Sequence, residues 1–505
     1  MSKRTLLWLS AILIVAGFLR FYHLTQTPPG LYPDEAMDGD NALQALHTGD
    51  FKVFYAANNG EEGLFADLEA VVLAASGVHE PWTLRLPSAV FGFFTVLGLF
   101  FLARELFRRD GIALLAAFFL ATSFWHVNFS RIGFRAILAP FFLVWSVYFF
   151  TRSIRAARFV SSAWLATLGG LFFGLGAYSY ISYRIAPLLF LLMVPLLWRE
   201  RRFWRAGAVF ATVALLIMMP IGLYFLHHPA DFFGRTSQVS VLGSPHPAAD
   251  VFRNSVKTAE MLDFHGDENW RHNLPGRPEL SWPVGLAFWT GVILGLLLLF
   301  KKHEPRRDGL TRSRAGLPYL LCFAWIGLAG LPVVFSNEGV PHALRAILMI
   351  PPIMLLAAAG GAWIYDRAAK RLAAHGRVLT LAVGACLIAL MLTEGNAYFN
   401  TWARKTETSE AFTASLTTLG YNLRSVPRST PKYIVIDAAG GTIAQADPWD
   451  PAGRMENIPI AIQPVMFLTD TYLPQQQLEQ NIHYVLIQDK ASVPADALTA
   501  YVTMR

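Results

Sequence analysis

The sequence has little charge for its length. Charged residues make up 15% of its 505 residues, whereas hydrophobic residues make up 54%. An average soluble protein carries roughly 25% charged residues, so this chain cannot cover its apolar surface in water. The composition excludes an ordinary soluble protein and predicts a polytopic α-helical membrane protein.

Cysteine is scarce as well, because only Cys322 and Cys386 occur and both lie within apolar runs. Such thiols act as small buried hydrophobes and predict neither a disulfide nor a metal site. The sequence also lacks a glycine-rich phosphate loop and internal repeats. The first absence argues against a water-soluble nucleotide substrate, which such a loop would bind.

Long apolar runs account for most of the chain. Eleven stretches are near the roughly 20 residues that a helix needs to cross a bilayer. These predicted spans are 5–24, 86–103, 111–127, 136–151, 162–180, 185–198, 206–226, 282–300, 315–335, 343–365 and 376–394.

Basic residues alternate with these spans. If the N-terminus is cytoplasmic, the inner loops contain RELFRRD, RSIRAAR, WRERRFWR, KKHEPRRDGLTRSR and DRAAKRLAAHGR, as the positive-inside rule requires. The net charge of +7 is thus explained by topology and predicts no nucleic-acid partner. We expect a multi-pass protein of the plasma (inner) membrane whose active site lies in the outward loops. These are 25–85, 126–135, 178–184, 227–281 and 336–342.

The sequence changes character near residue 396. KYIVID (432–437) and HYVLIQD (483–489) are typical of buried strands, and a helical pattern precedes them. We therefore expect a transmembrane domain over 1–395 and a small extracytoplasmic α/β domain over 396–505.

Four acids gather in TPPGLYPDEAMDGDN (27–41), in the first outward loop. Pro33 favours a helix start, so a short surface helix is predicted over 34–48. Asp34 and Glu35 lie closest to the membrane and are the catalytic candidates, because a carboxylate can take a proton from a nucleophile. Asp38 and Asp40 are explained equally well as solvated acids at a helix N-terminus.

Arginines mark the mouths of several outward helices. Guanidinium groups bind phosphate in a bidentate manner, although they can also extend toward lipid headgroups. The candidates for binding a donor phosphate are Arg131, Arg135, Arg184 and Arg345.

Other outward residues are predicted to line a substrate cleft. The tyrosines among them could instead form an interfacial aromatic belt. The cleft candidates are Tyr178, Tyr180, Tyr183, His265, Asp267, Glu268, Arg271, His272, Asn273, Glu338 and His342.

Within HGDENWRHNLPGRP (265–278), four residues have the side-chain types that bind divalent metals. They are His265, Asp267, Glu268 and His272. Their spacing matches no standard zinc pattern, so a polar loop ordered over the cleft is the alternative. A divalent metal cation is the one cofactor for which the sequence offers candidates.

Several motifs resemble those of GT-C class membrane glycosyltransferases, which include protein O-mannosyltransferases and lipid A aminoarabinose transferases. They are PPGLYPDEA after the first span, RLPSAVFG (85–92) at the second, then SRIGFRAILAP, GLGAYSYISYRIAP, RHNLPGRP and EGVPHALRAI. The later motifs resemble a bacterial subgroup of the family 39-like enzymes, and the resemblance covers about residues 1–395.

The resemblance implies a polyprenyl-phosphate-linked sugar donor and transfer on the extracytoplasmic side. It implies that Asp34 acts in the catalytic centre beside Glu35, and that Arg135 and Arg345 bind the lipid phosphate. The chain lacks the lumenal repeat domain of eukaryotic protein mannosyltransferases and the Trp-Trp-Asp signature of oligosaccharyltransferases. The acceptor is therefore left open among proteins, lipids and glycans.

We predict an inverting hexosyl- or pentosyltransferase in contact with membrane lipids, with Asp34 as general base and Glu35 as a second acid or orienting group. A transporter or flippase for a lipid-linked or anionic substrate is the first alternative. It would require charges near the bilayer midplane and pseudo-symmetric halves, and the sequence shows neither. A non-enzymatic scaffold is the second, and it would not need acids and arginines around one cleft.

Overall fold

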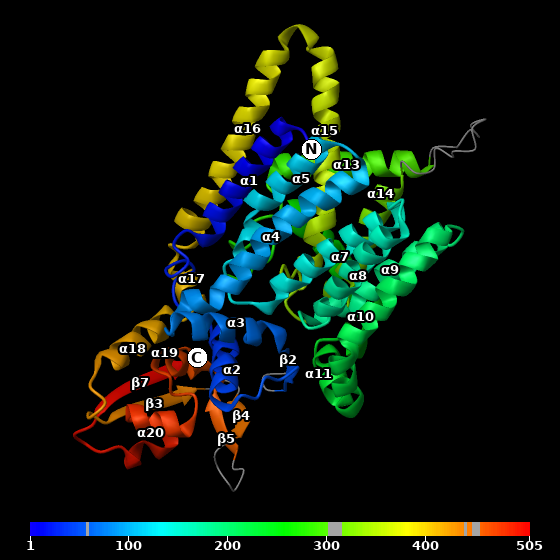
Figure 1. Ribbon diagram of the computed structural model, residues 1–505. Coiled ribbons are helices and arrows are strands. Elements are labelled where there is room, and N and C mark those ends of the chain that lie inside the picture. The colour runs from blue at the N-terminus through cyan, green and yellow to red at the C-terminus, as the bar shows by residue number, and fades with distance from the viewer. Residues whose placement is uncertain (57–59, 301–315, 439–441, 447–454, 505) are drawn as a thin grey trace. The chain divides into compact units, whose positions relative to one another are not determined.

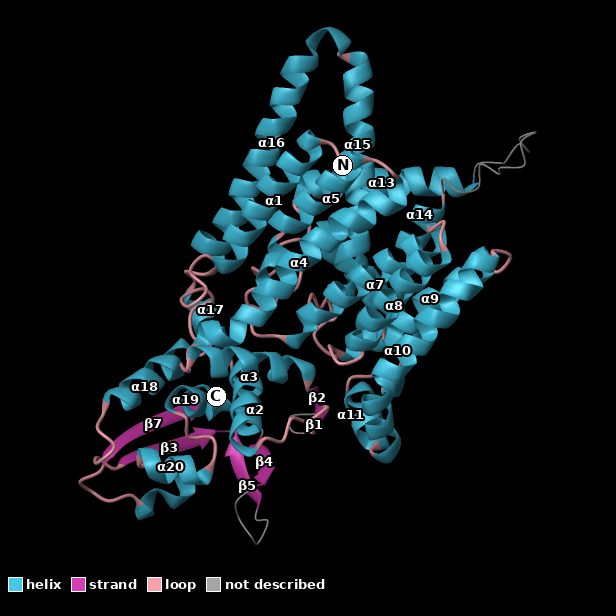
Figure 2. Ribbon diagram, viewed as in Figure 1, coloured by secondary structure: helices cyan, strands magenta, loops and turns pink. Residues whose placement is uncertain are grey.

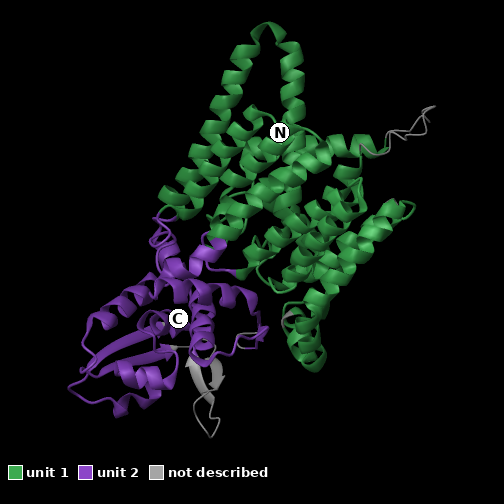
Figure 3. Cartoon of the chain, viewed as in Figure 1, with its two compact units in different colours: residues 1–22, 89–130, 135–402 green, residues 23–88, 131–134, 403–505 purple. Residues whose placement is uncertain are grey.

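The computed structural model describes residues 1–56, 60–300, 316–438, 442–446 and 455–504. Figures 1 and 2 show that helices dominate the chain, with a few short strands. The chain forms two compact units, coloured separately in Figure 3. Unit 1 contains residues 1–22, 89–130 and 135–402, and unit 2 contains 23–88, 131–134 and 403–505. The C-terminal segment therefore shares a unit with most of the first predicted outward loop.

The helices of unit 1 follow the apolar runs. Nine helices within the described ranges are long and apolar enough to cross a membrane, which confirms a polytopic membrane protein. The helices are α1 (Lys3–Phe21), α4 (Pro81–Phe107, which starts in unit 2), α5 (Asp110–Thr122), α6 (Phe124–Phe129), α7 (Leu138–Arg155), α8 (Phe159–Gly176), α9 (Ala186–Leu197), α10 (Arg201–His227), α11 (Pro229–Gln238), α12 (Pro247–Asp263), α13 (Trp282–Phe300), α14 (Leu317–Val334), α15 (Ile350–Arg371) and α16 (Gly376–Asn396), which a π-helical turn (Ala397–Trp402) extends.

Two of the eleven predicted spans form shorter apolar helices. The stretch 111–127 is divided into α5 and α6 at Ser123, whose Oγ accepts a bond from His126 N at 3.4 Å and so caps α6. The stretch 185–198 becomes α9, which follows a 3₁₀ turn over Ile181–Ile185. The predicted inner loop KKHEPRRDGLTRSR lies outside the described residues. The long loop 227–281, which is predicted to face outward, contains α11 and α12, which the sequence did not predict.

Arg20 is a fully buried charge in the first spanning helix. Its Nη1 donates to the backbone oxygens of Ala16 and Ala121, both at 3.1 Å, and its Nη2 donates to Leu120 O at 3.3 Å. A buried charge is tolerated when hydrogen bonds compensate its lost hydration. Arg20 thereby links α1 to the end of α5.

Glycines allow α13 and α15 to approach closely. A Cβ at Gly360 would collide with the backbone oxygen of Ala287 and would lie 2.5 Å from Gly291 N. Small residues at such crossings let the backbones of membrane helices pack against each other. Gly361 is different, because its Cβ would meet side chains at 3.7 Å or more.

Unit 2 combines helices with small sheets. Its elements are α2 (Pro33–Thr48), β1 (Phe54–Tyr55), β2 (Glu61–Glu62), α3 (Leu64–Ser76), α17 (Thr406–Ala411), α18 (Ala414–Ser425), β3 (Lys432–Ala438), β4 (Thr442–Ala446), β5 (Met455–Pro459), α19 (Gln463–Thr469), α20 (Pro474–Gln480), β6 (Ile482–Leu486) and β7 (Leu498–Met504). The helix predicted over 34–48 is confirmed by α2.

The largest sheet of unit 2 has three parallel strands in the order β6–β3–β7. Ile434 of β3 is paired with Tyr484 of β6 and Ala500 of β7. The strand predicted at 432–437 is confirmed, whereas the one predicted at 483–489 ends at Leu486 and continues as a 3₁₀ turn. β1 pairs with β2, and β4 with β5, in antiparallel fashion. The core beside the sheet is apolar and includes Leu416, Leu423, Ile434, Ile436, Ile462 and Val465.

The first loop is fastened to the C-terminal segment within unit 2. Leu31 N donates to Thr417 Oγ1 at 2.8 Å, and Thr413 Oγ1 donates to Leu31 O at 2.7 Å. Gly30 adopts φ +79°, and a Cβ there would lie 2.6 Å from Ala414 Cα. The start of α18 therefore holds the turn that leads into α2.

The α13–α15 contact predicts opposite effects for two adjacent glycines. Gly360→Ala should lower the free energy of unfolding by about 1–3 kcal/mol, because the methyl group overpacks the crossing. Gly361→Ala should leave it unchanged or raise it by up to about 1 kcal/mol through helix propensity. Thermal unfolding of the purified protein in detergent measures both, and equal effects would contradict the packing described.

Candidate functional site

The carboxylate of Glu35 accepts four hydrogen bonds within unit 2. Glu35 Oε1 accepts bonds from Gly133 N at 2.7 Å and from Arg85 Nε at 3.0 Å. Glu35 Oε2 accepts bonds from Tyr32 N at 3.0 Å and from Arg85 Nη2 at 3.2 Å. Both charged side chains are fully buried. Glu35 thus holds three segments of unit 2 together, and its role as a second acid or orienting group stays a prediction.

Arg85 extends this anchor to the preceding turn. Its Nη1 donates to Pro28 O at 2.8 Å, and its Nη2 donates to Gly30 O at 2.5 Å. The adjacent Asp34 is half-buried in the first turn of α2. Because Pro33 begins the helix and Glu35 is fixed, the backbone position of Asp34 is fixed on both sides.

Asp38 and Asp40 are not solvated, contrary to the expectation for a surface helix. Their exposed fractions are 4% and 0%, because α2 packs against α3 and α19. Both carboxylate oxygens of Asp40 lack a hydrogen-bond partner among the described residues, and the same holds for the buried Glu69 of α3. Burial, together with the nearby charge of Asp470, raises the pKa of Asp40 well above its ordinary value. Burial also raises the pKa of Glu69, with further contributions from Glu35, Glu61 and Asp40.

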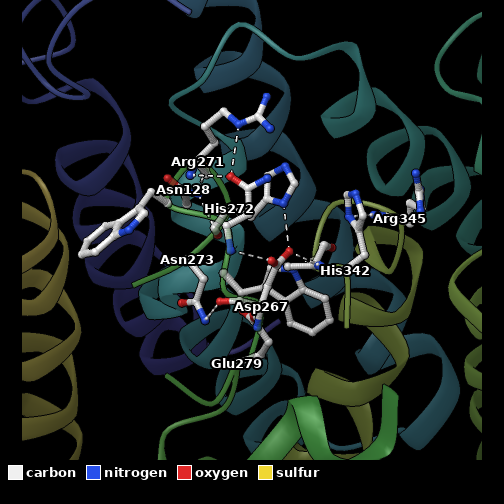
Figure 4. Close-up of polar contacts among 12 residues, drawn as sticks. Asn128, Asp267, Arg271, His272, Asn273, Glu279, His342 and Arg345 are labelled. Carbon is white, nitrogen blue, oxygen red and sulfur yellow. Dashed lines mark hydrogen bonds and ion pairs between the residues drawn. The ribbon is translucent and has the colours of Figure 1, made fainter. Parts of the chain in front are cut away.

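The second cluster lies in unit 1 and centres on Asp267 (Figure 4). Asp267 Oδ2 accepts bonds from His272 Nδ1 at 2.8 Å and from Ala343 N at 2.7 Å, and its Oδ1 accepts one from Asn269 N at 2.8 Å. The His272 and His342 rings are 4.8 Å apart. One donor atom from each of Asp267, His272 and His342 lies within 4.8 Å of the other two. Sequence separation hid His342 from the predicted metal set.

The surrounding loop is held from several helices of unit 1. Asn128 Nδ2 donates to the backbone oxygens of Arg271 and His272, both at 2.8 Å. Trp402 Nε1 donates to Trp270 O at 2.8 Å, and Arg277 Nη2 pairs with Glu394 Oε1 at 2.5 Å. These bonds fix the loop backbone, as a binding site requires.

Burial shifts the pKa values of two titratable groups at this cluster. Burial lowers the pKa of His272, although its hydrogen bond to Asp267 acts in the opposite direction. Burial and the charge of Asp267 raise the pKa of Glu279 well above its ordinary value. His272 is therefore neutral at pH 7 and donates from Nδ1 to the carboxylate.

The remaining predicted residues of this loop have individual environments. His265 Nε2 pairs with Glu268 Oε1 at 2.8 Å, with side chains that are 59% and 70% exposed. Asn273 Nδ2 donates to Arg277 O at 2.5 Å. Arg271 Nε donates to Asn269 Oδ1 at 3.1 Å. Only Asp267 and His272 of the predicted metal candidates are brought together with a third ligand.

The predicted phosphate-binding arginines also have distinct contacts. Arg131 Nη2 donates to Thr27 O at 2.9 Å, and the Arg135 guanidinium lies 5.9 Å from the centre of the Tyr180 ring. Arg184 Nη1 donates to Phe232 O at 2.5 Å. Arg345 donates to Glu338 O at 2.7 Å, to Ser336 Oγ and to the exposed Glu338 carboxylate.

The other two tyrosines are anchored in unit 1. Tyr178 Oη donates to Ile217 O at 2.8 Å, which links the end of α8 to α10. Tyr183 is 3% exposed and packs against Phe173 with ring centres 5.8 Å apart. Both rings thus pack within unit 1, and their role in a substrate cleft stays a prediction.

Sequence reasoning missed Arg85, Asn128, Glu69 and Glu279. Arg85 stands at the start of the apolar run 86–103, and a charged residue there is a usable signal for a buried contact, whereas Asn128 lies among the polar residues His126, Ser130 and Arg131 and does not stand out. Glu69 and Glu279 carried no comparable signal, because their burial depends on distant parts of the chain.

Known proteins resemble this chain in its fold, and a known family model matches part of its sequence. Residues 68–224 match the family model of dolichyl-phosphate-mannose-protein mannosyltransferases. ArnT from Cupriavidus metallidurans bound to undecaprenyl phosphate is similar, with a TM-score of 0.55 and 13% identity over 96% of this chain and 89% of ArnT. The oligosaccharyltransferase AglB from Archaeoglobus fulgidus is similar with a TM-score of 0.51 and 13% identity over 86% of this chain.

This chain has the GT-C membrane glycosyltransferase fold. The GT-C resemblance of its motifs is thereby confirmed. The chain covers 62% of AglB, less than two thirds of that protein. No curated protein sequence matches the chain significantly.

The buried ion pair between Arg85 and Glu35 leads to a prediction about stability. Arg85→Met should lower the free energy of unfolding by roughly 3–5 kcal/mol, because it leaves Glu35 as an unpaired buried charge. Adding Glu35→Gln should recover part of this loss. The matched control is Lys52→Met, whose exposed pair with Asp50 should contribute less than about 1 kcal/mol. Equal losses for Arg85→Met and Lys52→Met in denaturant unfolding would refute this role.

The raised pKa of Asp40 makes a second prediction. Burial favours the protonated form of Asp40 in the folded state. The contribution of Asp40 to the free energy of unfolding is therefore fully present below the pKa of the unfolded state, and it is lost as the pH rises through the raised pKa of the folded state. Asp40→Asn should therefore be more stable than the wild type at neutral and alkaline pH, with a smaller advantage near pH 4. Thermal unfolding across this pH range measures the difference. Asp50→Asn should follow the wild type, and a wild type whose stability is no more pH-dependent than that of Asp40→Asn would contradict the assignment.

Proposed function

We propose that this protein transfers a hexosyl or pentosyl group from a polyprenyl-phosphate-linked sugar to an extracytoplasmic acceptor, with inversion at the anomeric carbon. The acceptor supplies a hydroxyl or an amine and belongs to a protein, a lipid or a glycan. The protein resides in the plasma membrane with its N-terminus in the cytoplasm, and its 396–505 domain and active site face outward.

The main observation in support of this proposal is the fold that this chain shares with ArnT over 96% of its length. That ArnT structure holds undecaprenyl phosphate, and the AglB structure holds dolichol-phosphate with an inhibitory peptide. The family model matched by residues 68–224 describes a dolichyl-phosphate-mannose-dependent transferase. These three findings favour a lipid-phosphate sugar donor over a nucleotide sugar.

Asp34 serves as the general base. Its carboxylate takes the proton from the acceptor as the acceptor oxygen or nitrogen bonds to the anomeric carbon. The bond between this carbon and the phosphate oxygen breaks, and the polyprenyl phosphate leaves with the electron pair. Glu35, bonded to Arg85 and Gly133 N, acts as a positioning residue that keeps Asp34 in place.

The leaving phosphate gains negative charge during this step, and arginines are suited to stabilise it. The candidates are Arg131, Arg135, Arg184 and Arg345. Arg345 is the strongest of them, because its guanidinium is held at the N-terminal approach to α15 by Ser336 and Glu338. The N-terminus of a helix additionally favours bound anions.

Asp34→Asn tests the base assignment. The variant should lose roughly 10²–10⁴-fold in transfer rate, while its thermal unfolding midpoint stays near that of the wild type. The assay uses protein reconstituted in lipid with a synthetic undecaprenyl-phosphate sugar and follows donor consumption. Asp50→Asn, near the C-terminal end of the same helix and exposed, is the matched control and should retain full activity.

The acceptor is found by mass spectrometry of cell-envelope glycans and glycoproteins with and without the gene. Loss of one glycan or glycoprotein species in the deletion strain, restored by the wild type and not by Asp34→Asn, is expected. Full transfer activity of Asp34→Asn would eliminate it as the base. An unchanged envelope together with no donor turnover would reject the glycosyltransferase itself.

A further inference from the structure

Helix α12 (Pro247–Asp263) does not show the pattern of a helix that faces water. A surface helix in water places its apolar stripe on the protein and its polar side chains outside. Much of α12 shows the reverse, because the polar Asn254 and Thr258 are buried, whereas Phe252 and Val256 are 72% and 40% exposed. In the last turn the apolar Met261 and Leu262 are buried as well. Residues about four positions apart share one face of a helix, and the exposed apolar face of α12 consists of Ala248, Phe252, Val256 and Ala259.

The buried side of α12 is bonded to the end of a spanning helix. Asn254 Nδ2 donates to Val334 O at 3.0 Å and to Ser336 O at 2.7 Å. Val334 is the last residue of α14, which is one of the helices long and apolar enough to cross a membrane. The last carbonyl groups of a helix have no partner within the helix, and the Asn254 amide supplies one. The middle of α12 is therefore level with the end of the α14 span.

The C-terminal end of α12 lies beside a second spanning helix, α13. Asp263 Oδ2 accepts a bond from Trp289 Nε1 at 2.6 Å, and a Cβ at Gly285 would collide with the Asp263 carboxylate. Because α13 begins at Trp282, Trp289 lies about 10 Å along its axis at 1.5 Å per residue. Interfacial helices bury their apolar faces about 5–10 Å into the boundary between headgroups and acyl chains. The end of α12 is therefore at the depth of an interfacial helix.

Exposed aromatic side chains continue the apolar face of α12 toward α13. Phe264, directly after α12, is exposed, and so are Trp282 and Trp289 of α13. Tryptophan is enriched where a membrane meets water. Because the exposed side chains of a spanning helix contact lipid, the apolar face of α12 is continuous with a surface that lipid covers.

The charges beside the apolar face have both signs. Arg253 Nη1 pairs with Asp250 Oδ1 at 3.2 Å, and the exposed Lys257 and Glu260 follow on the same helix. Such a set complements the phosphate and ammonium groups of a zwitterionic phospholipid. A surface that selects anionic lipid would instead carry an excess of lysine and arginine.

We infer that α12 is an interfacial helix whose apolar face enters a leaflet of zwitterionic phospholipid, on the side of the membrane that the loop 227–281 faces. Asn254 then connects a helix embedded in lipid to the segment that carries Ser336, whose Oγ accepts a bond from Arg345. The inference does not rest on the proposed glycosyl transfer, because contact with lipid is measured without donor or acceptor.

The experiment places a nitroxide label on α12 of the full-length protein. Phe252→Cys is labelled in a background in which Cys386, the exposed cysteine, is replaced by alanine, while the buried Cys322 stays. The protein is reconstituted in vesicles of phosphatidylcholine and phosphatidylethanolamine. Oxygen partitions into the bilayer and a neutral nickel chelate stays in water, and each accelerates the relaxation of a nitroxide that it reaches. The ratio of oxygen to nickel accessibility should be several times higher for Phe252→Cys than for Lys257→Cys, the matched control at the polar edge of the helix.

The outcomes separate lipid from water and from protein. Because Phe252 is largely exposed, its labelled variant should keep the unfolding midpoint of the wild type. Full nickel access at both positions would mean that the apolar face lies in water, and low access of both reagents at position 252 would mean that protein covers it. Either result would overturn the inference. Replacing part of the lipid with phosphatidylglycerol should leave the ratio at position 252 unchanged, and a ratio that is high only with phosphatidylglycerol would overturn the choice of a zwitterionic headgroup.

Discussion

The buried carboxylate of Glu35 is the interaction on which the acidic helix depends. Its two oxygens accept hydrogen bonds from the Arg85 guanidinium and from the backbone amides of Gly133 and Tyr32. Glu35 therefore joins three segments that are far apart in the sequence. An anion withdrawn from water must be compensated in this way. The turn before α2 and the first turn of the helix then follow, because Arg85 also holds Pro28 O and Gly30 O. The backbone of the functional candidate Asp34 is therefore placed by the bonds of its neighbour Glu35.

The C-terminal segment contributes to the same arrangement. Thr413 and Thr417 at the start of α18 bond to the Leu31 backbone, and a side chain at Gly39 of α2 would collide with Phe467 of α19. Residues 403–505 therefore share a compact unit with α2. Their contact also explains why Asp40 is buried, since the face of α2 that carries it is covered. A change in this segment would alter the position of the acids even though it lies hundreds of residues away in sequence.

Local signals in the sequence predicted a large part of the fold. Apolar length predicted the spanning helices, Pro33 predicted the start of α2, and β-branched residues predicted β3. The error over 111–127 arose because a single serine, Ser123, ends α5 and caps the next helix, which hydropathy does not register. The site was harder to predict. Polar residues in loops predicted to face outward stood out in the sequence, but their partners did not; these residues are Asp34, Glu35, Asp267, His272 and His342. Glu35 binds Arg85 across 50 positions and Asp267 binds Ala343 N across 76, and no short-range pattern encodes such pairs.

The Glu35 cluster and the Asp267 cluster share one feature, a buried carboxylate that accepts hydrogen bonds from backbone amides. In each, a buried carboxylate is fixed by backbone amides, and the polar residue beside it is thereby placed. Glu35 has the permanent cation Arg85 as its partner, so its charge is balanced within the chain, and the group suits a structural role. Asp267 has the imidazole of His272 as its side-chain partner, and burial raises the pKa of the neighbouring Glu279 well above its ordinary value. Three arginines also lie near this cluster, because the charges of Arg271 and Arg345 act on His272 and the charge of Arg277 acts on Glu279. The anchor of unit 2 therefore depends on a pair with a guanidinium, which is charged at every physiological pH, whereas the cluster of unit 1 depends on backbone amides and an imidazole whose pKa burial lowers.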